Sequence, residues 1–225
     1  MSPSLSTRCV AELFGTATLV AIGTGAIVAG ANAGGVPQWI LAAAWFAAVA
    51  IPVQAVGFVS GAHLNPAVTL GLVASDRFPA REVPPYVASQ VAGAFAGSLV
   101  VLFVLGGAAH LGSTIPGPGG PGWIFPLEFA FTFLLVLSVL YLSRLGRPPN
   151  RGELFLPAIV VGVSTLLIGP WTGSSLNPAR SIAPAVISGE FAWLWAYLVT
   201  LSLAACVAAL VASRWPVRGA IRPPT

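Results

Sequence analysis

Ser-Gly-Ala-His-Leu-Asn-Pro-Ala-Val-Thr, residues 60–69, is the stretch from which the fold can be inferred. Its core occurs a second time as Ser-Leu-Asn-Pro-Ala-Arg-Ser at residues 175–181. In each copy Asn directly precedes Pro. Proline suits the first position of a helix, where its missing N–H would have no partner, and Asn suits the N-cap position before it. We therefore predict two short helices that begin at Pro66 and Pro178, with Asn65 and Asn177 at their positive ends.

The composition indicates an integral membrane protein. The chain has 225 residues, of which 56% are hydrophobic and only 7% are charged, whereas roughly a quarter of the residues in a soluble domain are charged. Two cysteines and two histidines provide neither a disulfide framework nor a cluster of metal ligands, and we find no nucleophile–base pair. We therefore expect no enzymatic activity, no cofactor and no bound metal. We also expect no nucleic-acid partner, because the excess of arginine is better explained as a topology signal.

Six segments approach the roughly 20 apolar residues that a transmembrane helix needs. The predicted fold class is therefore an all-α membrane protein with six transmembrane helices, at about 10–30, 38–58, 84–106, 123–143, 153–169 and 190–213.

Two of the connections, 59–83 and 170–189, are long and largely apolar, and each contains one Asn-Pro-Ala. Irregular backbone at membrane depth is tolerated only where it is buried in protein or lines a water-filled cavity. We therefore predict that both connections are re-entrant segments, each carrying one half-helix.

The connection 107–122 is rich in Gly and Pro, cannot form a helix and links two similar halves, 8–106 and 123–213. We expect these halves to form one transmembrane domain, 1–225. An odd number of spans in each half places the halves in opposite orientations, which is an inverted repeat.

The two halves begin alike and are spaced alike. Glu12 opens the first half in Ala-Glu-Leu-Phe-Gly-Thr, and Glu128 opens the second in Leu-Glu-Phe-Ala-Phe-Thr. Asn65 follows Glu12 by 53 residues, and Asn177 follows Glu128 by 49 residues. This correspondence supports the inverted repeat.

The arginines predict the orientation. With both termini in the cytoplasm, nine of the ten arginines lie on the cytoplasmic side, as the positive-inside rule requires: these are Arg8, Arg77, Arg81, Arg144, Arg147, Arg151, Arg214, Arg218 and Arg222. The exception is Arg180, within the second re-entrant segment. We expect a multi-pass protein of the plasma or inner membrane.

At this point the sequence resembles the aquaporin, or major intrinsic protein, family from Ala11 to about Leu210. The likeness includes the Ala-Glu-x-x-Gly-Thr opening, both copies of Asn-Pro-Ala, Ser-Gln-Val-Ala-Gly-Ala at 89–94 and Asn-Pro-Ala-Arg-Ser. The resemblance implies a right-handed six-helix bundle with two half-helices, a homotetramer, and one pore in each subunit. It also implies that the two Asn-Pro-Ala motifs, Asn65-Pro66-Ala67 and Asn177-Pro178-Ala179, meet at the centre of the pore.

Two amide NH₂ groups at the positive ends of two helices can donate to one passing oxygen. A water held in this way directs its own hydrogens outward, which interrupts a proton wire and opposes cations. The other interpretation is that each Asn only caps its helix.

The family places Arg180 at the outer constriction, where its donors would bind a solute oxygen and its charge would reject cations. The alternative is an arginine that extends to the outer surface.

Counted from the two Asn residues, the family's other constriction positions fall on Trp45, Thr165 and Ser174. Trp45 resembles glycerol facilitators, whereas Ser181 resembles water channels, and the His of water-selective members is absent. The combination also resembles the plant nodulin-like branch, which passes glycerol and uncharged metalloid acids. We expect a wider, more amphipathic opening than a water-only filter has, unless Trp45 is simply a packing or lipid-facing aromatic.

We expect His63 to line the inner pore, and both a structural and a gating role are open for it. By resemblance, Glu12 and Glu128 accept hydrogen bonds from the re-entrant backbone.

The sequence thus favours a passive channel that excludes protons and ions. Its solutes would be water and small neutral molecules, such as glycerol, urea or uncharged metalloid acids. The alternative is a secondary active transporter of a small polar solute, for which Glu12, Glu128 and His63 would be the coupling groups.

Overall fold

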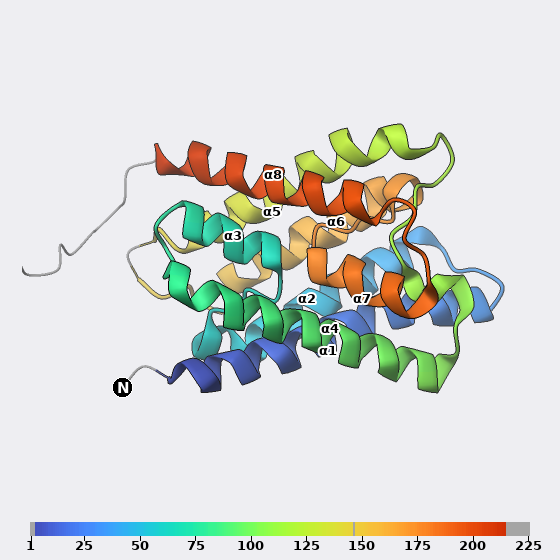
Figure 1. Cartoon of the computed structure of the whole chain (residues 1–225), viewed down its shortest axis with the longest axis horizontal. Coiled ribbons are helices and arrows are strands. Elements are labelled where there is room, and N and C mark those ends of the chain that lie inside the picture. Colours follow the sequence, from blue (N-terminus) through green and yellow to red (C-terminus); the bar gives the residue numbers. More distant parts are fainter. Residues whose placement is uncertain (1–2, 146, 215–225) are drawn as a thin grey trace, which may run out of the picture.

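A computed structural model of the chain describes residues 3–145 and 147–214, and the regular elements in these ranges are all helical. Six long segments are apolar enough to cross a membrane. The main helices of these segments are α1 (Leu5–Asn32), α2 (Gln38–Ser60), α4 (Val83–Leu105), α5 (Phe129–Leu142), α6 (Leu156–Thr172) and α8 (Leu194–Ser213). Two short helices, α3 (Pro66–Ala74) and α7 (Pro178–Ser188), complete the bundle (Figure 1). The prediction of an all-α membrane protein with six spans is confirmed.

Both short helices begin where the sequence predicts, but several boundaries of the long helices differ from the prediction. Helix α1 begins at Leu5 rather than near residue 10, because the Ser4 hydroxyl caps it by accepting the Thr7 N–H at 3.2 Å. Helix α8 begins at Leu194 rather than at 190, after an irregular turn. The fourth span includes a 3₁₀ turn, Pro121–Trp123, and a π-helical turn, Ile124–Glu128, before α5.

The two re-entrant segments begin later than predicted, at Gly61 rather than 59 and at Gly173 rather than 170. Helix α6 continues through Pro170 to Thr172, although Pro170 has no N–H to donate to the carbonyl four residues before it. Gly61 and Gly173 each adopt a left-handed conformation, with φ of 87° and 76°, and end α2 and α6. Glycine favours this conformation because it has no Cβ.

The connection between the halves contains no α-helix, as predicted. Ala109, His110 and Leu111 form a left-handed turn, with φ of 47°, 48° and 55°, within the segment Ala108–Gly112. This turn packs against α1, α4 and α7. It therefore closes over the end of α7 instead of extending away from the bundle.

The bundle is built from two sets of packed helices. Helix α1 packs against α2 and α4, whereas α5 packs against α6 and α8; α2 and α6 join the two sets. Gly93 and Gly97 of α4 lie against α1 so closely that a Cβ on either residue would collide with the carbonyl oxygen of Leu13 or Ala17. The small residues of α4 thus allow the two backbones to touch.

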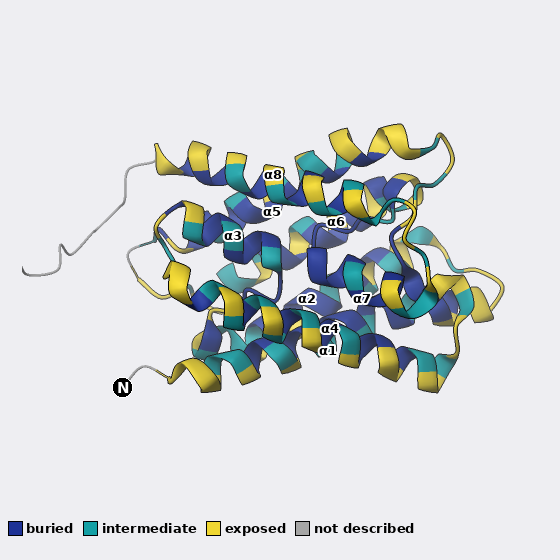
Figure 2. Cartoon of the chain, viewed as in Figure 1, coloured by how far each residue is buried: buried dark blue, intermediate teal, exposed yellow. Residues whose placement is uncertain are grey.

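The outer surface of the helices is apolar and exposed, and the inward faces are buried (Figure 2). Phe103, Val104 and Leu210, for example, are 82%, 73% and 67% exposed. A soluble protein rarely exposes so much contiguous apolar surface, so this surface fits the hydrocarbon interior of a membrane.

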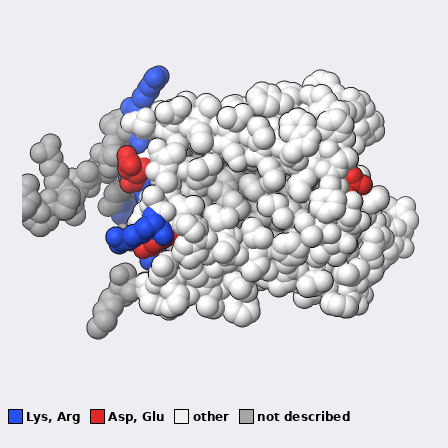
Figure 3. All heavy atoms as spheres, viewed as in Figure 1, with Lys and Arg blue, Asp and Glu red and all other residues white. Residues whose placement is uncertain are grey.

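The short helices α3 and α7 lie inside the bundle and meet end to end at their N-termini (Figure 1). Charged side chains gather at one end of the molecule, the end where α1 begins (Figure 3). The arginines Arg218 and Arg222 lie outside the described residues.

Candidate functional site

The two Asn-Pro-Ala motifs meet through a reciprocal pair of hydrogen bonds. The Nδ2 of Asn65 donates to the carbonyl of Leu176 at 2.8 Å, and the Nδ2 of Asn177 donates to the carbonyl of Leu64 at 2.8 Å. Each side-chain oxygen accepts from its own helix, from the Ala67 N–H at 2.8 Å and from the Ala179 N–H at 3.0 Å. Each Asn therefore caps its helix and also joins the two half-helices, through different atoms of one amide.

The backbone before each Asn is held in an unusual conformation. Ala62 and Leu64 have φ of 46° and 51°, and the matching residues Ser174 and Leu176 have φ of 47° and 54°. Left-handed φ is unfavourable for residues other than glycine. Surrounding contacts must therefore hold both segments in place.

Glu12 provides those contacts in the first segment. Its carboxylate accepts hydrogen bonds from the N–H groups of His63 and Leu64 at 2.9 and 2.7 Å. It also accepts from the Ser60 hydroxyl at 2.7 Å and from Nε2 of Gln90 at 2.8 Å. A buried carboxylate needs such donors, since an unpaired charge inside a membrane protein is costly.

Glu128 makes the equivalent contacts in the second segment. It accepts from the N–H groups of Ser175 and Leu176 at 2.8 and 3.0 Å and from the Thr172 hydroxyl at 2.7 Å. Tyr86 and Tyr197 are also equivalent, because their hydroxyls donate to the carbonyls of Ser60 and Thr172, respectively. Both halves thus support their re-entrant backbone with the same set of groups.

Two cavities lie on either side of a constriction. The inner cavity, about 410 Å³, extends from Arg77 and Arg147 past His63, Asn65 and Asn177 to Trp45. The outer cavity, about 310 Å³, is lined by Trp45, Thr165 and Arg180 and by the left-handed turn at His110. Trp45 borders both cavities, so its side chain lies where they approach each other.

Trp45 and Arg180 contact each other at this place, for which we use the name constriction. Trp45 is only 2% exposed, and the Arg180 guanidinium lies over its ring at 4.6 Å from the centroid. Trp45 is therefore neither lipid-facing nor at the surface. A guanidinium over the face of an indole is attracted by the ring electrons, most strongly where water is excluded.

Arg180 is completely buried and is held by backbone carbonyls. Its Nη1 donates to Gly112 at 2.7 Å and its Nη2 donates to Gly173 at 3.4 Å. Its Nε has no hydrogen-bond partner among the described residues. The arginine does not extend to the outer surface, and its charge is fixed at the constriction.

Thr165 lies at the constriction, but Ser174 is placed differently. Thr165 lines the outer cavity, and its hydroxyl donates to the Val161 carbonyl at 2.9 Å. Ser174 is not among the residues that line either cavity; its hydroxyl lies 2.8 Å from that of Ser164. Ser181 is also turned away, since it accepts a hydrogen bond from the Thr114 hydroxyl at 2.9 Å.

His63 lines the inner cavity, where the sequence places it. Its Nδ1 lies 3.1 Å from the Thr69 hydroxyl, and its ring packs against Phe78 and Tyr86. These contacts fix the ring on three sides and favour a structural role.

Sequence reasoning missed three residues at the constriction. A Cβ on Gly23 would come within 2.6 Å of the Trp45 ring, so Gly23 provides the space that the indole fills. Gln38 lines the outer cavity and donates to the Thr165 carbonyl at 2.6 Å. Gly112 supplies the carbonyl for Arg180 from a loop that carries no recognisable motif. Of these three residues, only Gln38 could have been found from the sequence, because it is a polar residue at the start of an apolar span.

Known proteins resemble this chain along nearly its whole length. The family model described as "Major intrinsic protein" matches residues 1–212. A rice protein named Aquaporin NIP1-4 (Oryza sativa subsp. japonica) is 38% identical, with 88% of this chain and 73% of the relative aligned. Aquaporin AqpM from Methanothermobacter marburgensis is 36% identical over 93% of this chain and 96% of its own.

A solved structure of another protein has a similar fold. The X-ray structure of the aquaglyceroporin from Plasmodium falciparum superposes with a TM-score of 0.78 at 26% identity, covering 94% of this chain and 95% of that one. The match therefore covers nearly the whole length of both chains. The chain belongs to the major intrinsic protein family.

Proposed function

We propose that this protein is a passive channel whose solutes pass from the outer to the inner cavity beside Trp45 and Arg180. The observation that carries the proposal is the joined pair of half-helices, with Asn65 and Asn177 both lining the inner cavity. Water and small neutral polar solutes are the substrates.

Exclusion of protons and cations follows from the donors along this route. Each amide NH₂ has two hydrogens, and one is used on the opposite carbonyl, so the second can donate to a passing oxygen. The N-termini of α3 and α7 add their positive ends at the same level, and the buried charge of Arg180 adds to the field.

The solute range depends on the shape of the constriction. Trp45 provides a flat apolar wall, and Thr165 faces the outer cavity with its hydroxyl already bonded to its own helix. An apolar wall next to a fixed cation suits a solute with one carbon face and one hydroxyl face, such as glycerol. Urea and uncharged metalloid acids have the same neutral, polar character.

A secondary active transporter is the alternative, and the contacts of its coupling groups favour the channel. Glu12 and Glu128 are fully engaged in supporting the re-entrant backbone. A coupled transporter needs titratable groups that are free to change partners. The relatives named above are all aquaporins or an aquaglyceroporin.

We further propose one channel domain built from inverted repeats, 8–106 and 123–213, in a homotetramer. The matching contacts of Glu12 and Glu128 support the repeat, and the family supports the tetramer. The charged end seen in Figure 3 supports a cytoplasmic location for both termini in a plasma or inner membrane.

The proposal is tested with the purified protein in liposomes, by stopped-flow light scattering under osmotic shock. We expect faster shrinkage than in empty liposomes, a low activation energy and no dependence on a proton or sodium gradient. Parallel measurements with glycerol and urea give the solute range. Transport that requires an ion gradient would establish the transporter instead.

A further inference from the structure

The inner cavity opens between two arginines that the pore itself does not use. Arg77, in the connection between α3 and α4, and Arg147, in the connection between α5 and α6, both line it. No aspartate or glutamate is among the described residues that line this cavity. Among the described residues, two arginines and no acidic side chain therefore line this cavity.

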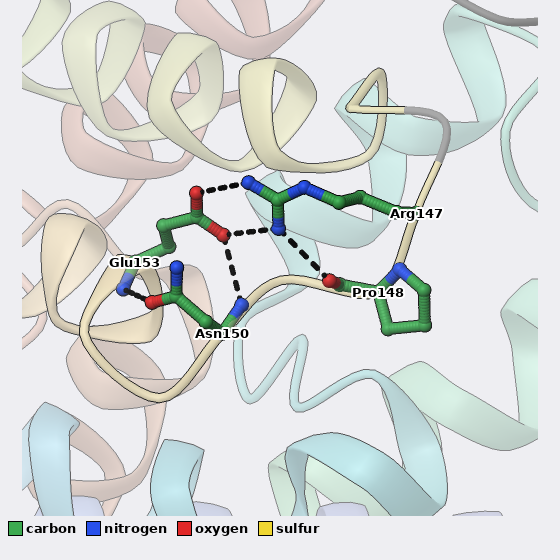
Figure 4. A network of polar contacts seen from close by, with 4 residues as sticks. All are labelled: Arg147, Pro148, Asn150 and Glu153. Atoms are coloured by element: carbon green, nitrogen blue, oxygen red, sulfur yellow. Dashed lines mark hydrogen bonds and ion pairs between the residues drawn. The ribbon is translucent and has the colours of Figure 1, made fainter.

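Arg147 is held by a network of polar contacts with Pro148 and Glu153 in the loop that follows it (Figure 4). Its guanidinium binds the Glu153 carboxylate through two hydrogen bonds of 2.6 and 2.9 Å, and it donates to the Pro148 carbonyl at 3.1 Å. Asn150 and Glu153 each accept the backbone N–H of the other, at 2.9 and 2.8 Å. These contacts hold the guanidinium in place, and the Glu153 carboxylate compensates the charge of Arg147.

Arg77 has no comparable acidic partner. Its Nη1 donates to the Ser143 carbonyl at 3.4 Å, and it forms no ion pair among the described residues, not even with its exposed neighbour Asp76. Burial, and then the charge of Arg77, lower the pKa of Arg144. Of the two guanidinium groups that line the cavity, that of Arg77 therefore has no carboxylate partner among the described residues.

The size and walls of the cavity suit a small organic anion. Its volume of about 410 Å³ lies within the range of small-molecule sites, about 300–1,000 Å³. Apolar side chains, including Phe58, Leu142 and Leu154, line it next to the two guanidinium groups. Guanidinium groups bind phosphate through paired, charge-assisted hydrogen bonds.

We propose that the inner mouth is a phosphate-binding site, with Arg77 as the main ligand and Arg147 as a second guanidinium in the lining, and that an occupied site blocks the route. The predicted block of flux rests on the proposed function, whereas the predicted binding of phosphate does not. Two sources can supply the group: a soluble phosphate monoester of a small polyol, or the headgroup of an anionic lipid.

Binding is measured by calorimetry on the full chain in uncharged detergent, with inorganic phosphate and glycerol 1-phosphate as probes. We expect saturable binding that weakens about tenfold in Arg77→Gln, because a charge-assisted bond is lost. Arg77→Lys, which keeps the charge, should lie between. Arg81→Gln, an exposed arginine outside the cavity, is the matched control and should bind as the wild type does.

Flux is measured in neutral phosphatidylcholine vesicles with added probe, and in vesicles containing phosphatidic acid. Inhibition by the soluble probes identifies a free phosphate ligand, and inhibition only by phosphatidic acid identifies a lipid; either result supports the site if Arg77→Gln relieves it. The proposal is overturned if the soluble probes do not bind and phosphatidic acid has no effect, or if Arg81→Gln changes the response equally. Absence of water flux in every vesicle would instead contradict the proposed function, while calorimetry still decides the site.

Discussion

Asn65 and Asn177 are joined through each other's loops, since each amide donates to the carbonyl two residues before the opposite proline. We expect Asn65→Ala to leave the Ala67 N–H and the Leu176 carbonyl unpaired. Each unpaired buried group costs about 1–3 kcal/mol. The melting temperature in detergent should therefore fall clearly, together with the water flux.

Asn32→Ala is the matched control for this change. Its amide also donates to a backbone carbonyl, that of Leu105 at 2.8 Å, but Asn32 is exposed. Its loss should barely change the melting temperature. Equal shifts for the two variants would mean that the central amide pair contributes no more than a surface bond.

Replacement of Trp45 tests the wall of the constriction. Trp45→Phe should raise glycerol and urea flux relative to water flux, and Trp45→Ala should raise it further, because the route beside Arg180 widens. The measurement is the ratio of the permeabilities in liposomes. Trp39→Ala, in the same helix but 64% exposed, is the control; unchanged ratios in the Trp45 variants would remove Trp45 from the filter.

Arg180→Val tests charge exclusion. The change removes the only arginine that is buried at the constriction among the described residues. We expect proton and cation leak to rise severalfold, measured with a pH-sensitive dye inside liposomes, while water still passes. A proton leak equal to that of the wild type would argue against this role.

Gly93→Ala tests the close crossing of α1 and α4. The new Cβ would collide with the Leu13 carbonyl, so the helices must separate. Overpacking of this kind costs about 1–3 kcal/mol, and the melting temperature should fall. Gly122→Ala adds the same methyl group where no atom lies within 4 Å, and a similar loss there would show that helix crossing is not the cause.

Much of this architecture could be predicted from the sequence because the responsible signals are local. Length and hydropathy define the six spans, and Asn followed by Pro defines the starts of α3 and α7. The helix ends were less predictable: Pro170 suggested an early end for α6, yet the helix continues to Thr172. The start of α8 depends on a turn that carries no clear cap.

The site was predictable only in part, because its details depend on contacts between distant segments. Glu12 and Glu128 could be placed by spacing, whereas the carbonyl of Gly112 that holds Arg180 could not. Ser174 turns its hydroxyl toward Ser164 because its left-handed backbone redirects the side chain, which no motif reveals.

The most direct measurement of the central claim is a blocking experiment at the constriction. Cys9 and Cys206 are replaced by Ser or Ala, Thr165→Cys is introduced at the outer cavity, and water flux is recorded before and after a bulky membrane-impermeant thiol reagent. We expect modification to abolish the flux and a reducing agent to restore it, with no effect on the cysteine-free parent. Undiminished flux through fully modified protein would contradict a route beside Trp45 and Arg180.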